Sequence, residues 1–178
     1  MKNITTYVSA GIALTSVFAG TAAAAASVNP VESAISAAPA SIQSAAAVMT
    51  MDGKVLRKGT NGWTCYPDDP ASPGNDPMCV DKNGLAWVNA EMAKKPPPKA
   101  VGLAYMLQQG SDASNLDPSL AKPPAGQKWV TTGPHMMILS AEVAAASGYP
   151  TKQANPDTTK PYVMYGGTPY AHIMFPVK

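Results

Sequence analysis

Two histidines and two methionines form the most chemically suggestive pattern in this 178-residue sequence. Each histidine precedes a methionine by two positions, His135 with Met137 and His172 with Met174. Successive side chains of an extended strand point to opposite faces, so each His-x-Met pair would present one nitrogen and one sulfur on the same face. Imidazole and thioether groups together select Cu(I) over hard cations. The sequence therefore predicts a soft-metal site, with the alternative that the methionines fill the core and the histidines are hydrogen-bonded.

Two extended segments near the end of the chain must carry these pairs. Residues 129–139 have the pattern of a strand, but a Gly-Pro step lies directly before His135. Because proline cannot donate a hydrogen bond to a sheet, this step predicts a bulge or an edge position beside the histidine. Residues 162–165 and 170–177 flank a Gly-Gly-Thr-Pro turn and predict a C-terminal hairpin.

The motifs around the two histidines resemble those of a known family. His135-Met136 and His172-Ile173-Met174 are similar to the His-Met and His-x-Met ligand pattern of periplasmic copper chaperones of the PCuAC type. The resemblance implies an exported β-sandwich that binds copper through these side chains. This chain departs from that family after the first motif, where alanine and serine occupy residues 145–147 in place of a further methionine.

A second resemblance covers more of the chain. The segments Gly-Thr-Asn-Gly-Trp-Thr-Cys (59–65), Gly-Asn-Asp-Pro-Met-Cys (74–79) and Gly-Thr-Pro-Tyr-Ala-His-Ile-Met (167–174) are similar to segments of uncharacterised secreted bacterial proteins. This resemblance implies one exported domain and brings no activity with it.

Residues 1–26 are typical of a cleaved Sec signal peptide. Lys2 gives a positive start, residues 4–20 are largely apolar, and the alanine-rich run up to Ala26 offers Ala-x-Ala cleavage sites. Polar residues interrupt this stretch, which is shorter than the about 20 apolar residues that a membrane-spanning helix needs. We expect a mature chain that starts near Ser27, resides in the periplasm or the medium, and is not stably inserted in a membrane.

The charge of the chain excludes some classes of partner. The formal net charge is +2, and loss of Lys2 with the signal peptide leaves 12 basic against 11 acidic residues. A nucleic-acid-binding domain needs a basic patch or stripe, which this composition lacks. We therefore expect an unknown small ligand or a metal ion as the partner, and Cu(I) is the one cofactor that the sequence suggests.

The two cysteines of the chain, Cys65 and Cys79, predict one structural disulfide. Exported proteins retain such bonds, and the residues between these cysteines are mostly turn formers that cannot stabilise themselves by burial. Closing a loop of about 15 residues stabilises a fold by about 3 kcal/mol in the chain-entropy model.

The mature chain begins with a segment of ambiguous structure. Residues 27–46 are rich in alanine and serine and predict either an irregular arm or a short helix. A helix would have Asn29 as its N-cap and Pro30 at its first position.

From residue 47 onwards the pattern indicates short strands. The Asp-Gly step at residues 52–53 predicts a hairpin over residues 48–58 with a type I′ turn, in which both central residues have positive φ. A further strand at residues 63–66 would extend this hairpin into a three-stranded meander.

The middle of the chain alternates between helical and strand patterns. Leu85, Val88 and Met92 form a helical stripe over residues 85–94, with Trp87 beside it. A strand is predicted at residues 101–108 and a long loop at residues 110–127. A short helix, capped by Ser140, is predicted at residues 141–147.

Together these segments predict an α+β fold. Residues 47–178 would form a single domain, with a mostly antiparallel sheet of about six to eight strands and two or three short helices. A β-sandwich is the nearest alternative.

The function that this pattern favours is that of an exported, non-enzymatic binding or structural module, with copper binding as its most specific form. The alternative is a small secreted enzyme with His172 or His135 as general base. The chain has neither a Gly-x-Ser-x-Gly nor a His-Glu-x-x-His motif, and no catalytic residue is predicted. Acidic residues between Asp68 and Asp81 could supply Ca²⁺ ligands, but Asp, Asn and Pro also cluster in turns for backbone reasons.

Overall fold

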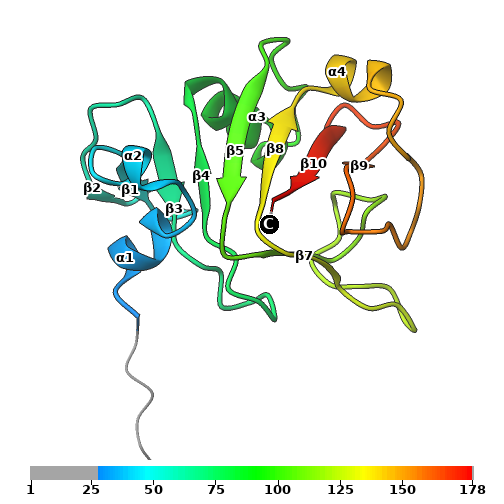
Figure 1. Ribbon diagram of the computed structural model, residues 1–178, viewed down its shortest axis with the longest axis horizontal. Helices are drawn as coiled ribbons and strands as arrows, with labels where there is room; N and C mark the ends of the chain where they lie inside the picture. Colours follow the sequence, from blue (N-terminus) through cyan, green and yellow to red (C-terminus); the bar gives the residue numbers. More distant parts are fainter. Residues whose placement is uncertain (1–27, 178) are drawn as a thin grey trace, which may run out of the picture.

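Figure 1 shows the computed structural model of the chain, which describes residues 28–177. One eight-stranded sheet crosses the molecule, a two-stranded ribbon lies beside it, and four short helices pack around the strands. This is the predicted α+β fold, but residues 28–177 contain four helices and not the predicted two or three, because the N-terminal segment forms two of them. The alternative of a β-sandwich is wrong, because helices and a small ribbon occupy the places that a second large sheet would take. The predicted signal peptide, residues 1–26, lies outside the described residues.

The strands of the main sheet, in their order across it, are β2 (Val55–Arg57), β1 (Ala47–Met49), β3 (Thr64–Tyr66), β4 (Met78–Val80), β5 (Gly102–Met106), β8 (His135–Leu139), β10 (His172–Pro176) and β9 (Tyr162–Met164). The ribbon consists of β6 (Gly110–Asp112) and β7 (Val130–Thr132). The helices are α1 (Pro30–Ile35), α2 (Ala40–Gln43), α3 (Lys82–Met92) and α4 (Ala141–Ala146). Neighbouring strands are antiparallel except for β1 and β3, which run parallel.

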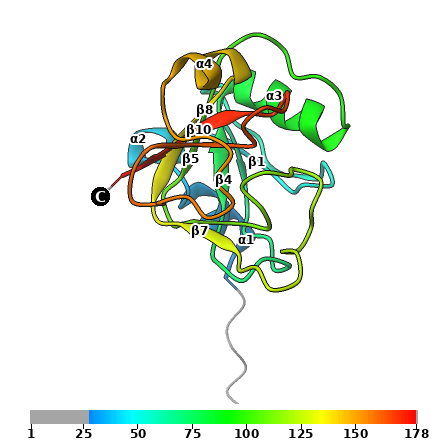
Figure 2. The same ribbon diagram turned by 90° about the vertical axis from the view of Figure 1, so that its right-hand side faces the viewer.

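The helices divide between the two faces of the main sheet. One hydrophobic cluster joins the α1–α2 segment to β1, β3 and β4 around the disulfide, and α4 packs against β10 on the same face. On the opposite face α3 contributes Trp87 and Val88 to a cluster that extends across the sheet from β3 to β9. Figure 2 shows α2 and α3 on opposite sides of the strands.

The N-terminal segment is helical. The Asn29 side chain accepts a hydrogen bond from the Val31 N–H at 2.9 Å, and Pro30 occupies the first helical position, as the sequence predicts for a helix. The inner side of this segment carries small residues, and Ala34 and Ala37 are fully buried in the cluster that contains the disulfide. Small side chains therefore let α1 lie close to the strands.

The predicted disulfide is confirmed. Cys65 on β3 and Cys79 on β4 stand directly opposite each other in the sheet and are bonded, with their Cα atoms 4.0 Å apart. The link therefore joins two neighbouring strands and closes the turn-rich segment between them.

Helix α3 begins earlier than the apolar stripe predicts. Asp81 caps it, because its side chain accepts a hydrogen bond from the Gly84 N–H at 2.7 Å. Trp87 is buried, whereas Met92 from the predicted stripe is half exposed. A Cβ atom on Gly102 would lie 2.6 Å from the Gly84 Cα, so glycine at both positions lets the helix rest directly on β5.

The predicted three-stranded meander is wrong. The β1–β2 hairpin forms, but positive φ occurs at Gly53 and not at Asp52, so its turn is not type I′. The chain after β2 then crosses the start of β1, where the Thr60 N–H donates to the Ala45 carbonyl at 2.8 Å. Because the crossing occurs at that end, β3 emerges on the other side of β1 and runs parallel to it.

The predicted strand over residues 129–139 is two strands in two different sheets. Pro134 lies in the break between β7 and β8, so the expected irregularity beside His135 is a full interruption. The expectation of an edge position is wrong, since β8 lies between β5 and β10. Strand β7 pairs instead with β6, which forms at the start of the segment 110–127, where the sequence predicts a loop.

The C-terminal third otherwise matches the prediction. Ser140 caps α4 through a hydrogen bond from the Val143 N–H at 3.3 Å, and Gly148 follows the helix with φ of +72°. Strands β9 and β10 form the predicted hairpin, with His172 opposite Met164.

Candidate functional site

The four sequence-predicted ligands lie on two neighbouring antiparallel strands, β8 and β10. Met137 stands directly opposite Met174. His135 is opposite Pro176 at one end of the paired stretch, whereas His172 lies at the other end. At about 3.3 Å per residue, the four steps along β10 from His172 to Pro176 correspond to about 13 Å. The antiparallel register thus brings the methionines together and places the histidines far apart.

Three of the four residues share one cavity. His172, Met137 and Met174 line a cavity of about 290 Å³ between the main sheet, α3 and β6. His135 is not among the lining residues. The structure therefore assembles one histidine, and not two, with the two predicted methionines.

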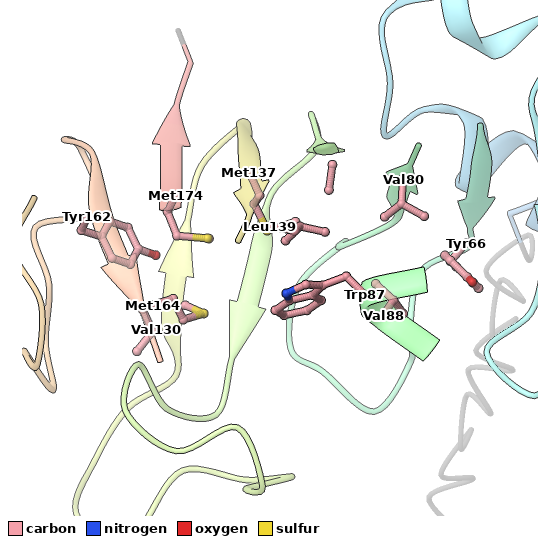
Figure 3. Packing of buried hydrophobic residues seen from close by; sticks show 11 residues of the cluster. Tyr66, Val80, Trp87, Val88, Val130, Met137, Leu139, Tyr162, Met164 and Met174 are labelled. Carbon is pink, nitrogen blue, oxygen red and sulfur yellow. The ribbon is translucent and has the colours of Figure 1, made fainter. Parts of the chain in front are cut away.

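The cavity is richer in methionine than the His-x-Met pattern indicates. Seven methionines line it, and they are Met51, Met78, Met92, Met106, Met137, Met164 and Met174. Most belong to the strands, because alternate residues of neighbouring strands point to the same face. In Figure 3 the side chains of Met164 and Met174 point toward Trp87. Met164 could have been found from the sequence, because its place in the C-terminal hairpin puts it beside His172.

His172 is held in a single orientation at the cavity wall. Its Nδ1 lies 2.9 Å from the Tyr170 carbonyl oxygen, and its ring packs edge-on against Trp87 and Tyr165 with centroids 5.4 and 5.5 Å away. The side chain is 4% exposed, and this burial lowers the pKa of His172 to about 4. The ring is therefore neutral at pH 7, with its proton on Nδ1 and a lone pair on Nε2. Among the described residues, Nε2 makes no hydrogen bond.

His135 has similar local bonding but different surroundings. Its Nδ1 lies 2.7 Å from the Gly133 carbonyl oxygen, and its buried Nε2 has no hydrogen-bond partner within residues 28–177. A Cβ atom on Gly110 would lie 2.8 Å from the His135 Cε1, so the backbone of β6 lies directly over the ring. Burial lowers the pKa of His135 as well. This histidine is enclosed by protein rather than open to the cavity.

Four carboxylates line the same cavity, and one of them is the exposed Asp69. The sequence patterns did not single out the other three as a group. They are Asp76 before β4, Glu91 on α3 and Asp112 on β6. Burial, together with the neighbouring charges of Asp76 and Glu91, raises the pKa of Asp112 to about 7. Burial also raises the pKa of Glu91 to about 7. The ion pairs of residues 28–177 involve other acids, so no lysine or arginine in this part of the chain pairs with the three.

Two aromatic side chains bring unpartnered polar atoms to the cavity wall. The Tyr66 hydroxyl and the Trp87 Nε1 are buried without a hydrogen-bond partner within residues 28–177, and both residues line the cavity. Figure 3 shows the Trp87 nitrogen on the side of the indole that faces Met137 and Met174. Buried polar groups of native proteins usually have partners, so these atoms are candidates for contacts with a ligand.

The enzyme alternative needs a histidine between a carboxylate and a nucleophile. In the described residues both Nδ1 atoms face backbone carbonyls, and no hydroxyl group is hydrogen-bonded to either imidazole. A general-base role for His172 or His135 thus stays a prediction without a supporting contact.

The acidic segment 68–81 follows turn chemistry. Asp68 accepts a hydrogen bond from the Asp76 N–H, Asp69 accepts one from the Ala71 N–H, and Asp81 caps α3. Within residues 28–177 no group of three or more His, Cys, Asp or Glu side chains is arranged to hold a metal ion.

None of the helices in the described part of the chain is long and apolar enough to cross a membrane. No protein-family model, curated protein or solved structure matches this chain. The resemblances to copper chaperones and to secreted bacterial proteins therefore stay predictions from short motifs.

Proposed function

We propose that this protein is an extracytoplasmic binding module that holds Cu(I) in the methionine-lined cavity. The observation that carries the proposal is the Nε2 of His172, a neutral imidazole nitrogen that has no hydrogen-bond partner among residues 28–177 and belongs to a cavity lined by thioethers. Nitrogen and thioether sulfur form a ligand set that prefers a soft monovalent ion.

The orientation of His172 suits a metal ligand. Metal-binding histidines usually donate their second ring N–H to a carbonyl or carboxylate, which fixes the tautomer and the direction of the free lone pair. The Tyr170 carbonyl is in the position to do this for His172. Because the pKa of His172 is lowered to about 4, protons do not compete for this nitrogen at neutral pH.

Three thioethers lie near this imidazole on the same face of the sheet. Met164 stands directly opposite His172 on β9, and Met174 is the next residue on the same face of β10. Met137 is opposite Met174 on β8. Directly opposed residues such as His172 and Met164 have Cβ atoms about 4.5–5.5 Å apart, and diagonal neighbours such as His172 and Met137 about 7–8 Å, which long side chains can still bridge. The proposed ligand set is His172 with two or three of these sulfurs.

This set differs from the four residues that the sequence suggests. His135 is excluded from the proposed site because it lies at the other end of the β8–β10 pairing, beneath Gly110. Met164 replaces it as a neighbour of His172.

The proposal includes export to the periplasm or the medium. The Cys65–Cys79 disulfide is of a kind that persists in oxidising compartments, and residues 1–26 have the pattern of a Sec signal peptide. We infer that the mature chain functions outside the cytoplasm, where it would bind copper without catalysing a reaction.

An anaerobic Cu(I) titration of the mature protein against a chromogenic chelator tests the proposal. We expect one ion per chain, with affinity reduced at least tenfold in His172→Gln and in Met174→Leu. Two variants serve as matched controls, His135→Gln for the imidazole and Met136→Leu for the thioether, since neither residue lines the cavity.

The result that would contradict the proposal is equally specific. Unchanged Cu(I) affinity in His172→Gln, or an equal loss in His135→Gln with its fold intact by circular dichroism, would exclude this site.

A further inference from the structure

The acidic wall of the cavity is not used by the proposed copper site. Asp76, Glu91 and Asp112 come from three separate segments and line one cavity, and no basic residue in the described part of the chain pairs with them. They are also not close enough to form a metal-binding group among residues 28–177. An organic cation can contact carboxylates at separate points of the wall. It therefore suits this arrangement better than a metal ion does.

Unpartnered polar atoms at the same wall independently indicate a ligand. Tyr66 is 2% exposed and Trp87 is 3% exposed, and the hydroxyl of the one and the Nε1 of the other lack partners within residues 28–177. The hydroxyl can accept a hydrogen bond from an ammonium group, and the indole N–H can donate one to a ligand oxygen. Both residues line the cavity with the three carboxylates.

Most of the other lining residues are apolar or aromatic. Methionine side chains adapt to irregular ligand shapes, and the faces of Trp87 and Tyr165 can attract a cation electrostatically. The volume of about 290 Å³ lies at the lower limit of cavities that hold drug-sized ligands, so it suits a smaller molecule.

We propose that the cavity binds a small organic ammonium compound, with its charged end at Asp112 and Glu91 and its short apolar body against the methionines. A hydroxyl group on the ligand would give the Trp87 N–H its missing partner. This inference goes beyond the proposed function and does not rest on it, because it uses carboxylates that the copper site does not need.

Calorimetric titration of the copper-free mature protein at pH 8 with three matched probes tests the inference. The probes are pentylamine, aminopentanol and pentanol, which share one alkyl chain and differ in their charged and hydroxyl ends. We expect both amines to bind, aminopentanol more tightly than pentylamine, and pentanol at least tenfold more weakly than either. Pentanol binding equal to that of pentylamine, or no heat from either amine at millimolar concentration, would overturn the inference.

Variants of the acidic wall locate the site. We expect Asp112→Asn and Glu91→Gln each to weaken pentylamine binding at least tenfold, because each removes a charge that faces the ammonium group. Glu142→Gln is the matched control, since Glu142 is an exposed acid that pairs with Lys99 and does not line the cavity. Unchanged amine binding in folded Asp112→Asn and Glu91→Gln would contradict the inference. Since these titrations contain no copper, their failure and the failure of Cu(I) binding are separate outcomes.

Discussion

The two faces of the main sheet are built on different principles. The face covered by α1 and α2 contains small, fully buried residues such as Ala34 and Val48 around the Cys65–Cys79 disulfide. The face covered by α3 contains a cavity lined by seven methionines and four carboxylates, and three of the lining residues have a buried polar atom without a partner among residues 28–177. The first face combines close packing with a covalent link. The second contains a cavity with polar groups that lack hydrogen-bond partners among residues 28–177.

This difference indicates that one face contributes mainly to stability and the other to binding. Close packing and a disulfide stabilise the native state, whereas buried polar groups without partners each destabilise it. A ligand that satisfies those groups would recover part of this free energy, so binding should raise the stability of the α3 face. We expect substitutions on the two faces to separate stability from binding.

Removal of the disulfide should have the largest effect on stability. We expect Cys65→Ala combined with Cys79→Ala to lower the free energy of unfolding by about 3 kcal/mol, because the unfolded chain regains the entropy of a loop of about 15 residues. Urea unfolding followed by circular dichroism measures this loss. Cu(I) affinity under native conditions should stay within a factor of two or so, since the link lies on the other face. A large loss of affinity in a folded variant would contradict the separation of the faces.

Replacement of a cavity carboxylate should raise the free energy of unfolding, whereas removal of the disulfide lowers it. The pKa of Asp112 is raised from 3.8 to about 7, so its contribution to stability is present below pH 4 and is lost as pH rises through 7. We expect Asp112→Asn to stabilise the protein at pH 8 by about 2 kcal/mol, a value reduced for the partial access of water to the carboxylate.

Urea unfolding of wild type and Asp112→Asn at pH 4 and at pH 8 measures this difference. The two proteins should be nearly equal in stability at pH 4, because the carboxyl group is then protonated in the native state and close to half protonated in the unfolded state, which leaves a difference of less than about 1 kcal/mol. A variant that is less stable than wild type at pH 8 would show that the charge is compensated in the native state.

Exchange of methionine for leucine in the cavity should have the smallest effect on stability. Met174→Leu conserves volume and apolar character, so we expect a loss below about 1.5 kcal/mol. The same substitution removes a proposed copper ligand, and Cu(I) affinity should fall at least tenfold. A stability loss near that of the disulfide variant would mean that the methionines are close-packed core rather than cavity lining. Thermal unfolding and the Cu(I) titration on one sample distinguish these outcomes.

Local patterns in the sequence predicted the elements whose chemistry is contained within a few residues. The caps at Asn29 and Ser140 and the β9–β10 hairpin depend on residues next to the backbone groups that they bond or turn. The disulfide was predictable because the chain has two cysteines and a turn-rich segment between them. The sequence also predicted that Met137 and Met174 each share a sheet face with the histidine two residues earlier, because side chains alternate with a period of two along a strand.

The tertiary structure decided how these elements meet. A period of two gives the face of a side chain but not the register of its strand, and the antiparallel register of β8 and β10 separated His135 from His172. The parallel pairing of β1 with β3 depends on where the chain crosses β1. The separations in sequence between Asp76, Glu91 and Asp112 form no recognisable motif. Packing of three separate segments brings these residues to one cavity. The sequence by itself thus determined the ligand types and the faces on which they lie, and only long-range packing determined which of them share a site.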